Sequence, residues 1–303
     1  MSKILVTGGA GFIGSHTVEN LLLQGHAVRV LDDLSTGRPD NLPDHPQLEL
    51  LIGDIRNSQA VMHAMQGVDR VLHLAAQVSV QASVDAPPAS AERNLTGFIN
   101  VLDAARQAGV QRFVYASSAA VYGQPITLPL SEGSAVHPAS PYGLEKLVND
   151  QYAKLYAELY GMSCLGLRYF NVFGPRQDPR SPYAGVLSKF KERIEQQATL
   201  LVFGDGEQTR DFIYVGDVAE ANRRALFADQ TGVLNVATGQ SRTLNQVIAS
   251  FGQVVGKQLD VSHQPARTGD IVHSAAQNSA LLAALGHFDF VTLEHGLAKL
   301  LAG

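Results

Sequence analysis

The sequence predicts an α/β fold, a doubly wound parallel sheet followed by a smaller C-terminal α/β lobe. Over the first 170 residues, short apolar runs alternate with amphipathic stretches, as in a parallel sheet that helices cover on both faces. The pattern then loosens into the proline- and glycine-rich segment NVFGPRQDPRSPYAG. With 303 residues, 45% of them hydrophobic, the chain is long enough for one large or two modest cores.

Six strands are expected in the first part of the chain. They are KILVT (3–7), AVRVLD (27–32), LELLIG (48–53), RVLHLA (70–75), RFVYAS (112–117) and SCLGLRY (163–169). The stretches that begin at Phe12 and Leu95 have helical spacing and end at glycines, which suit helix C-termini. A charged helix, VLSKFKERIEQQ, is expected in the second part. We therefore expect a first domain over 1–170 and a lobe over 171–303, with some segments of the lobe returning to the first domain.

The composition argues against several classes of function. The net charge of −5 provides no basic field for nucleic acid, and no apolar run approaches the roughly 20 residues that a membrane span needs. The apolar N-terminus is broken by glycines, so we read it as part of the fold and expect a cytoplasmic location. The ten histidines lack metal-ligand spacing, so no metal is expected. Cys164 stands in an apolar run, where a buried thiol is favoured over a catalytic nucleophile.

A dinucleotide site is predicted at the first strand. In VTGGAGFIGS, Gly8, Gly11 and Gly14 follow that strand and open a helix, whose N-terminal N–H groups suit a pyrophosphate. Asp32 ends the next strand at the right distance for the ribose hydroxyls, and with Asp33 it repels a 2'-phosphate, which favours NAD over NADP. The first domain is therefore read as a Rossmann-type, NAD-binding domain. A glycine-rich turn without a ligand is the alternative.

Two further strand ends fall on the same edge of the sheet. GDI (53–55) and HLAA (73–76) end the third and fourth strands. Asp54 has two readings, a hydrogen bond to the adenine amino group or a helix N-cap before IRNSQAV.

A catalytic pair is predicted in ASPYGLEK. If Ser140 caps a helix, Tyr142 and Lys146 lie four residues apart on one face. To act as a base near neutral pH, the phenol needs its pKa lowered from about 10 to about 7, roughly 4 kcal/mol, by Lys146 and a positive nicotinamide ring together. The phenolate then takes a hydroxyl proton while hydride leaves the same carbon.

Five motifs in order, TGGAGFIG, SSAAVYG, PYGLEK, RYFNVFGP and GEQTRDFIYVGDV, closely resemble the extended short-chain dehydrogenase/reductases, and among these the nucleotide-sugar 4-epimerases acting on UDP-glucose or UDP-N-acetylglucosamine. The resemblance runs from residue 3 to about 285. It implies that Ser118 bonds the reacting sugar oxygen, Tyr142 is the base and Lys146 holds the cofactor ribose. It also implies bound NAD, a UDP-sugar substrate and C4 epimerisation through a 4-keto sugar.

The resemblance also assigns binding residues. The cofactor residues are Gly8, Gly11, Phe12, Ile13, Gly14, Asp32, Asp33, Asp54, Ile55, Leu74, Ala75, Ala76, Tyr142, Lys146 and Tyr169. The substrate residues are Ser118, Asn94, Asn171, Val186, Val202, Phe203, Arg210, Arg267, Asp270 and Ser274. Asn171, Arg210 and Arg267 are assigned to the diphosphate, since two phosphates need fixed donors and positive charge. For Arg210 the alternative is a surface ion pair with Asp211 or Asp205.

Two features bear on the reaction and its substrate. In the related 4,6-dehydratases an Asp-Glu pair follows the serine or threonine, whereas Ala119 and Ala120 supply neither the acid nor the base that elimination needs. The family position that is bulky in enzymes restricted to plain hexoses falls on Ser274, which predicts room for an N-acetyl group. Val272 and Gln277 depart from the Arg and Asp of many relatives.

The helices in 96–109 and 142–161 resemble a pair that forms a four-helix homodimer interface in relatives. Packing of their apolar stripes on the sheet is the alternative. Other functions that remain open are a 4-ketosugar reductase, a uronate epimerase, and a dinucleotide sensor without catalysis; the last does not need Ser118, Tyr142 and Lys146 together.

Overall fold

The computed structural model describes residues 2–178, 185–266 and 272–302. Within them, seven parallel strands form the main sheet, in the order β10-β6-β5-β4-β1-β2-β3. Their bounds are β1 Lys3–Thr7, β2 Ala27–Asp32, β3 Leu48–Ile52, β4 Arg70–His73, β5 Arg112–Ser118, β6 Cys164–Tyr169 and β10 Gly232–Val236. This confirms the predicted doubly wound sheet, in which the strand order reverses between β1 and β4.

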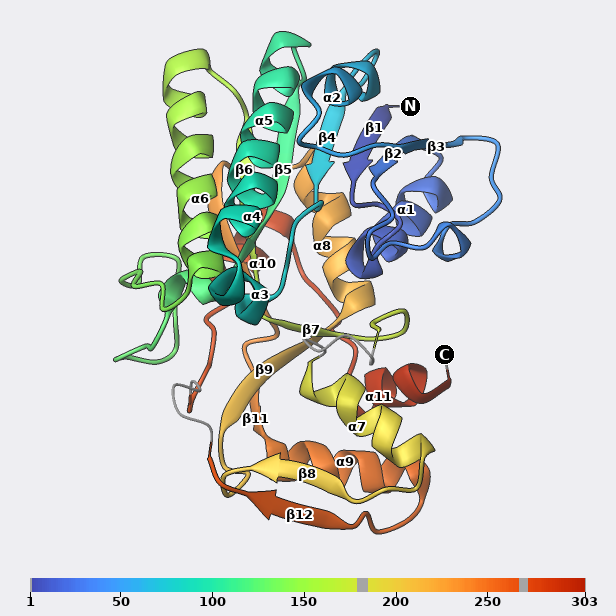
Figure 1. The fold of residues 1–303 in the computed structure, drawn as a ribbon, viewed down its shortest axis with the longest axis vertical. Helices are drawn as coiled ribbons and strands as arrows, with labels where there is room; N and C mark the ends of the chain where they lie inside the picture. Colours follow the sequence, from blue (N-terminus) through green and yellow to red (C-terminus); the bar gives the residue numbers. More distant parts are fainter. Residues whose placement is uncertain (1, 179–184, 267–271, 303) are drawn as a thin grey trace.

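Helices cover both faces of this sheet, because alternate side chains of its strands point to opposite faces. Ile4 and Val6 of β1 belong to the core beneath one group of helices, and Leu5 to the core beneath another. The first group is α1 (Phe12–Leu23), α8 (Val215–Phe227) and α10 (Ser279–Leu285). The second is α2 (Ser58–Ala64), α5 (Gly97–Gln107) and α6 (Pro141–Tyr160). The short helices α3 (Val80–Asp85) and α4 (Pro87–Ala91) lie beside α6 (Figure 1).

Three short irregular helices complete this part of the chain. They are the 3-10 helices η1 (Pro39–Asn41) and η3 (Ala119–Tyr122) and the π-helical turn η2 (Glu92–Thr96), which leads directly into α5. A π-helical turn is uncommon and frequently lies at a functional site. Here η2 contains Asn94, one of the predicted site residues.

The smaller lobe lies beyond the carboxyl ends of the main strands (Figure 1). One sheet contains β11 (Ser241–Thr243), β9 (Thr209–Tyr214) and β7 (Asn171–Phe173), and another contains β12 (Val261–Gln264) and β8 (Leu200–Phe203). Helices α7 (Val186–Glu195), α9 (Leu244–Val255) and α11 (Leu293–Ala302) pack on these strands around a separate core. β10, α8 and α10 return from this half of the sequence to the main sheet and its flanking helices.

Candidate active site

The glycine loop is shaped by close backbone contacts. A Cβ at Gly14 would lie 2.2 Å from the carbonyl oxygen of Gly8, and Gly8 itself has a φ of +70°. A Cβ at Gly8 would lie 2.7 Å from the backbone nitrogen of Ala75, so the loop lies directly against the end of β4. The N-cap of α1 is Gly11, which leaves first-turn N–H groups for an anionic ligand. The loop therefore fits the pyrophosphate of a dinucleotide at the β1/β4 switch point.

Asp32 is held where a ribose ligand is expected. Its carboxylate accepts hydrogen bonds from the backbone N–H groups of Ala10 (3.0 Å) and Leu34 (2.9 Å), which fix its orientation beside the glycine loop. Burial raises the pKa of this carboxyl, and the two backbone bonds oppose the rise. Asp33 is tied to Ser35, whose backbone N–H and hydroxyl donate to its Oδ1. These residues fit the predicted recognition of NAD.

The N-cap reading of Asp54 is wrong. The cap of α2 is Asn57, whose Oδ1 accepts from the backbone N–H groups of Gln59 (3.0 Å) and Ala60 (3.2 Å). Asp54 instead pairs with Arg56, with 2.6 Å between Oδ2 and Nη2, and this bond lowers the pKa of its carboxyl. The adenine contact remains a prediction. Other predicted cofactor residues stand at strand ends, with Leu74, Ala75 and Ala76 after β4 and Tyr169 at the end of β6, where its hydroxyl donates to Asn222 (2.6 Å).

The catalytic triplet is brought together by β5 and the first turns of α6. Ser118 ends β5; its Oγ accepts from the backbone N–H of Ala120 at 3.1 Å, and its hydroxyl lies near enough to Tyr142 to lower the pKa of that phenol. The predicted cap is confirmed: Ser140 Oγ accepts from the N–H of Gly143 at 3.1 Å. Lys146 is 3% exposed, and its Nζ donates to the carbonyl oxygen of Ala116 at 2.9 Å and lies 5.9 Å from the centre of the Tyr142 ring. The three side chains thus meet at the carboxyl end of β5.

Burial disfavours the charged forms predicted for this pair, the Tyr142 phenolate and the Lys146 ammonium. Burial raises the pKa of Tyr142, and only the nearby Ser118 hydroxyl lowers it. Burial also lowers the pKa of Lys146 to about 8, although Asp150 and Glu145 act to raise it. In the protein alone, burial therefore leaves the pKa of the Tyr142 phenol raised. The predicted lowering depends on the positive nicotinamide ring, the group that would also accept and return hydride.

A cleft in the smaller lobe contains half of the described substrate residues. Its volume is about 280 Å³, and Asn171, Val186, Phe203 and Arg210 are among the residues that line it. The cleft begins near the catalytic triplet. Ser118 of β5 pairs with Tyr169 of β6, and Asn171, which lines the cleft, follows Tyr169 by two residues. Asn171 donates to the carbonyl oxygen of Asp211 at 3.0 Å.

Val202 is placed differently from its neighbours. Its side chain is buried in the lobe's core, whereas Leu201 and Phe203 line the cleft, because side chains alternate along β8. Ser274 is 9% exposed, and its N–H donates to the carbonyl oxygen of Thr209 beside Arg210. Arg267 and Asp270 lie outside the described residues.

Arg210 is anchored by backbone groups. Its guanidinium donates to the carbonyl oxygens of Thr209 (2.8 Å) and Val272 (3.2 Å). The carboxylate of Asp211, one alternative partner, accepts instead from Thr238 and Gly239. The geometry therefore supports a guanidinium aimed by the backbone into the cleft.

Asn94 is buried, and its side-chain amide makes hydrogen bonds with Gln77 and Glu145. The sequence alone does not single out Gln77 or Glu145. A charged residue on a helix, such as Glu145, is usually solvated. The signal that identifies Glu145 is tertiary: it is only 4% exposed.

The buried thiol of Cys164 is not a further candidate site. Burial raises the pKa of the Cys164 thiol to about 12, which contradicts a role as nucleophile. The described part of the chain contains no cluster of three or more metal-ligating side chains and no helix long and apolar enough to cross a membrane.

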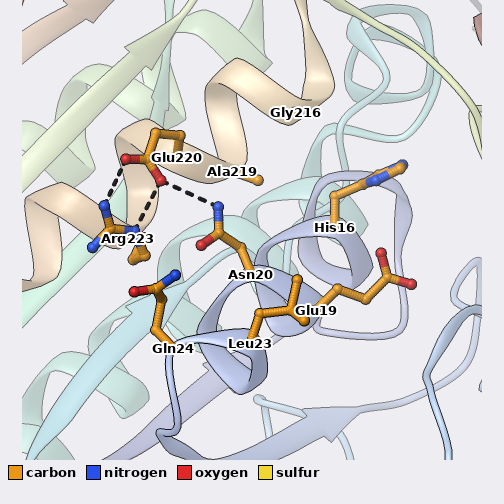
Figure 2. A pocket seen from close by; sticks show the side chains of 9 residues that line it. All are labelled: His16, Glu19, Asn20, Leu23, Gln24, Gly216, Ala219, Glu220 and Arg223. Atoms are coloured by element: carbon orange, nitrogen blue, oxygen red, sulfur yellow. Dashed lines mark hydrogen bonds and ion pairs between the residues drawn. The ribbon is translucent and has the colours of Figure 1, made fainter. Parts of the chain in front are cut away.

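A second, more open groove of about 390 Å³ lies between α1 and α8 (Figure 2). Its polar groups pair with one another: Glu220 Oε2 accepts from Asn20 (3.2 Å) and from Arg223 (2.8 Å). This groove is therefore accounted for by helix packing.

Comparison with known proteins agrees with this site. Residues 4–237 match the model of the NAD dependent epimerase/dehydratase family, and the chain belongs to that family. It is 39% identical over 303 residues to the UDP-glucose 4-epimerase of Mycolicibacterium smegmatis, covering 98% of this chain and 96% of that one. A putative UDP-glucose 4-epimerase of Methanocaldococcus jannaschii is 41% identical over 270 residues, or 88% and 87% of the two chains.

Solved structures give the same result. The UDP-N-acetylglucosamine 4-epimerase of Methanobrevibacter ruminantium M1, in complex with UDP-N-acetylmuramic acid, superposes with a TM-score of 0.95 at 37% identity, covering 99% of this chain and 97% of that one. The Thermus thermophilus UDP-glucose 4-epimerase complexed with NAD gives 0.91 at 38%, covering 99% and 98%. The predicted class, an NAD-dependent nucleotide-sugar 4-epimerase, is confirmed.

Proposed function

We propose that the chain interconverts UDP-N-acetylglucosamine and UDP-N-acetylgalactosamine, and that it also accepts UDP-glucose and UDP-galactose. The observation that carries the sugar preference is Ser274, a small residue held beside Arg210 by its bond to Thr209. A small side chain there leaves volume for an acetamido group. The neighbours named above include enzymes of both sugar types, so they support the class equally for either substrate.

The proposed roles are those that the family resemblance implies, and the positions of these side chains at the carboxyl end of β5 support them. Tyr142 takes the proton from the C4 hydroxyl and later returns it, Ser118 hydrogen-bonds the reacting oxygen, and Lys146 holds the cofactor ribose. Asn171 and Arg210 bind the diphosphate in the cleft, where a guanidinium matches phosphate oxygens in a bidentate manner. Ala119 and Ala120 supply no acid or base for elimination. The 4-keto sugar is therefore reduced again on its other face, and the bound NAD is not consumed.

The test is incubation of the purified protein, without added cofactor, with UDP-N-acetylglucosamine and separately with UDP-glucose, followed by chromatography for the C4 epimer. We expect the galacto product from both, with faster turnover of the N-acetyl sugar, and none from Tyr142→Phe. A requirement for added reduced dinucleotide identifies a ketosugar reductase instead. Absence of product with either sugar, even after NAD is added, rejects the epimerase assignment.

Ser274→Tyr tests the sugar preference. We expect turnover of the N-acetyl sugar to fall while turnover of UDP-glucose persists, because the added ring fills the acetamido volume. Unchanged N-acetyl turnover rejects the size argument.

We also propose a homodimer. α6 exposes Leu144, Leu155 and Leu159 on its outer face, at 53%, 44% and 62%, while the apolar residues Phe98 and Val101 of α5 are buried. The exposed stripe therefore lies on α6 itself, which stands at the edge of the molecule in Figure 1. Light scattering of the wild type and of Leu155→Glu tests this: we expect a dimer that the charge weakens, and a monomer at micromolar concentration for both rejects it.

A further inference from the structure

One segment connects the cofactor edge of the sheet to the catalytic helix. It starts after β4 with the predicted cofactor residues Leu74 to Ala76, passes Gln77 and continues as α3. Near its other end, Ser83 Oγ accepts a hydrogen bond from the backbone N–H of Tyr142 at 3.1 Å. The position of this segment therefore sets how the cofactor edge is placed relative to the base.

A buried polar network fixes the same segment at Gln77. The Asn94 amide bonds both backbone groups of Gln77: its Oδ1 accepts from the N–H and its Nδ2 donates to the carbonyl oxygen, each at 2.8 Å. Asn94 Nδ2 also donates to Glu145 Oε2 at 2.6 Å, and Ser90 Oγ donates to the same oxygen at 2.9 Å. The Gln77 side chain completes the network by donating to Ser90 Oγ at 3.1 Å.

The carboxylate of Glu145 is an unusual choice for this place. It is 4% exposed, and burial of a carboxylate is unfavourable unless hydrogen bonds compensate. Glu145 Oε2 accepts two hydrogen bonds here, from Asn94 and from Ser90, which compensate for that burial. Glu145 also lies between Tyr142 and Lys146 on α6. One side chain therefore joins the helix that carries the chemistry to the segment that faces the cofactor.

We propose that Glu145 is a positioning residue of this epimerase: through Asn94 it fixes Gln77, and with it the cofactor-facing segment, relative to Tyr142 and Lys146. Asn94 then acts through the backbone of Gln77 rather than by binding the sugar. The kinetic part of the proposal rests on the epimerase activity above, while the structural part stands without it.

Two substitutions of Glu145 distinguish the effect of its hydrogen bonds from the effect of its charge. Both bonds fall on Oε2, so Glu145→Gln keeps an oxygen acceptor for both donors, whereas Glu145→Ala removes it. Asn94→Ala breaks the connection from the other side. A matched control is Asp217→Asn, a buried carboxylate of the other helical layer whose Oδ2 accepts from the N–H of Val291 at 3.0 Å.

Turnover at neutral pH is the first measurement, with thermal melting of each variant beside it. We expect Glu145→Ala to lower kcat about 10–100-fold with KM within about threefold, since a misplaced reacting group reduces the rate and leaves sugar binding intact. Glu145→Gln should recover most of the loss. Asn94→Ala should resemble Glu145→Ala, and the double variant should lose no more than either single one, because coupled residues are not additive. Asp217→Asn should keep its kcat even if its melting temperature falls.

Hydrogen–deuterium exchange of the protein as purified is the second measurement and needs no turnover. We expect faster exchange of the Gln77 amide in Glu145→Ala and Asn94→Ala, and near wild-type exchange in Glu145→Gln. Three results would each overturn the proposal. They are a wild-type kcat in Glu145→Ala, additive losses in the double variant, and equal losses in Glu145→Gln and Glu145→Ala. If the wild type turns over no sugar, the epimerase assignment fails, and the exchange pattern alone decides whether Glu145 fixes this segment.

Discussion

The side chains of both halves of the site are bonded to the backbone, but the two halves differ in how deeply these side chains are buried. In the main domain, Lys146 and Asp32 are buried and bonded to the backbone of Ala116, Ala10 and Leu34, so they are oriented before any ligand binds. In the smaller lobe, Arg210 and Asn171 line an open cleft and stand on strands of a three-stranded sheet. In the proposed mechanism, the large core therefore holds the reacting groups and the lobe binds the sugar nucleotide. Substitutions in the first half should change kcat or cofactor retention, and those in the second should change KM.

The largest effect is expected at Tyr142. Tyr142→Phe should lower kcat about 10²–10⁴-fold, the usual contribution of a general acid–base group, with sugar binding retained. The matched control is Tyr160→Phe, an exposed tyrosine at the end of the same helix. Steady-state turnover and binding of the UDP-sugar check both. If Tyr142→Phe changed KM and not kcat, the contrast between the halves would fail.

Arg210→Ala should act on the other half. Loss of a charged hydrogen-bonding partner is worth about 1.5–3 kcal/mol, so KM for the UDP-sugar should rise roughly 10–100-fold with kcat changed much less. Arg242 is the control, because it is paired in register with Arg210 on the neighbouring strand but does not line the cleft. Equal effects of Arg210→Ala and Arg242→Ala on KM would contradict the phosphate role.

Gly14→Ala tests the cofactor cradle. The new Cβ would lie 2.2 Å from the Gly8 carbonyl oxygen, so the helix must shift, at a cost of about 1–3 kcal/mol. We expect a lower melting temperature and loss of copurifying NAD, measured by absorbance of the denatured extract. Gly133→Ala is the control, since a Cβ there would lie 4.0 Å from Ser131 Oγ. Retention of NAD by Gly14→Ala would show that the cradle tolerates this shift.

The last expected effect is an acid sensitivity of the main domain, which is small near neutral pH. Burial lowers the pKa of His73 to about 3 from 6.5, with Lys146 adding to the shift, and His73 Nδ1 shares a hydrogen bond with Thr7 (2.7 Å). Between these values the unfolded state binds more protons, so the free energy of unfolding falls as pH drops below 6.5, by about 1.4 kcal/mol per unit. Urea melts at several pH values should show this loss in the wild type and not in His73→Gln. Parallel curves would refute the assignment.

Much of the fold was predictable from local sequence. The six predicted strands match the observed ones to within two residues, because buried parallel strands are short apolar runs bounded by turns. The placement of Tyr142 and Lys146 was equally predictable, since they are one helical turn apart and Ser140 caps their helix. The N-cap reading of Asp54 failed because Asn57, three residues later, competes for the same role.

By itself, the sequence determined which residues form strands, where the glycine loop bends and which side chains can move a proton, because these depend on spacing within one element. Only the tertiary structure decided which polar groups are buried and which face a ligand. The burial of Glu145 against Asn94 joins residues 51 positions apart, and the orientation of Val202 away from the cleft follows from how β8 packs on its core. Burial and register arise from contacts between distant segments, which no local pattern records.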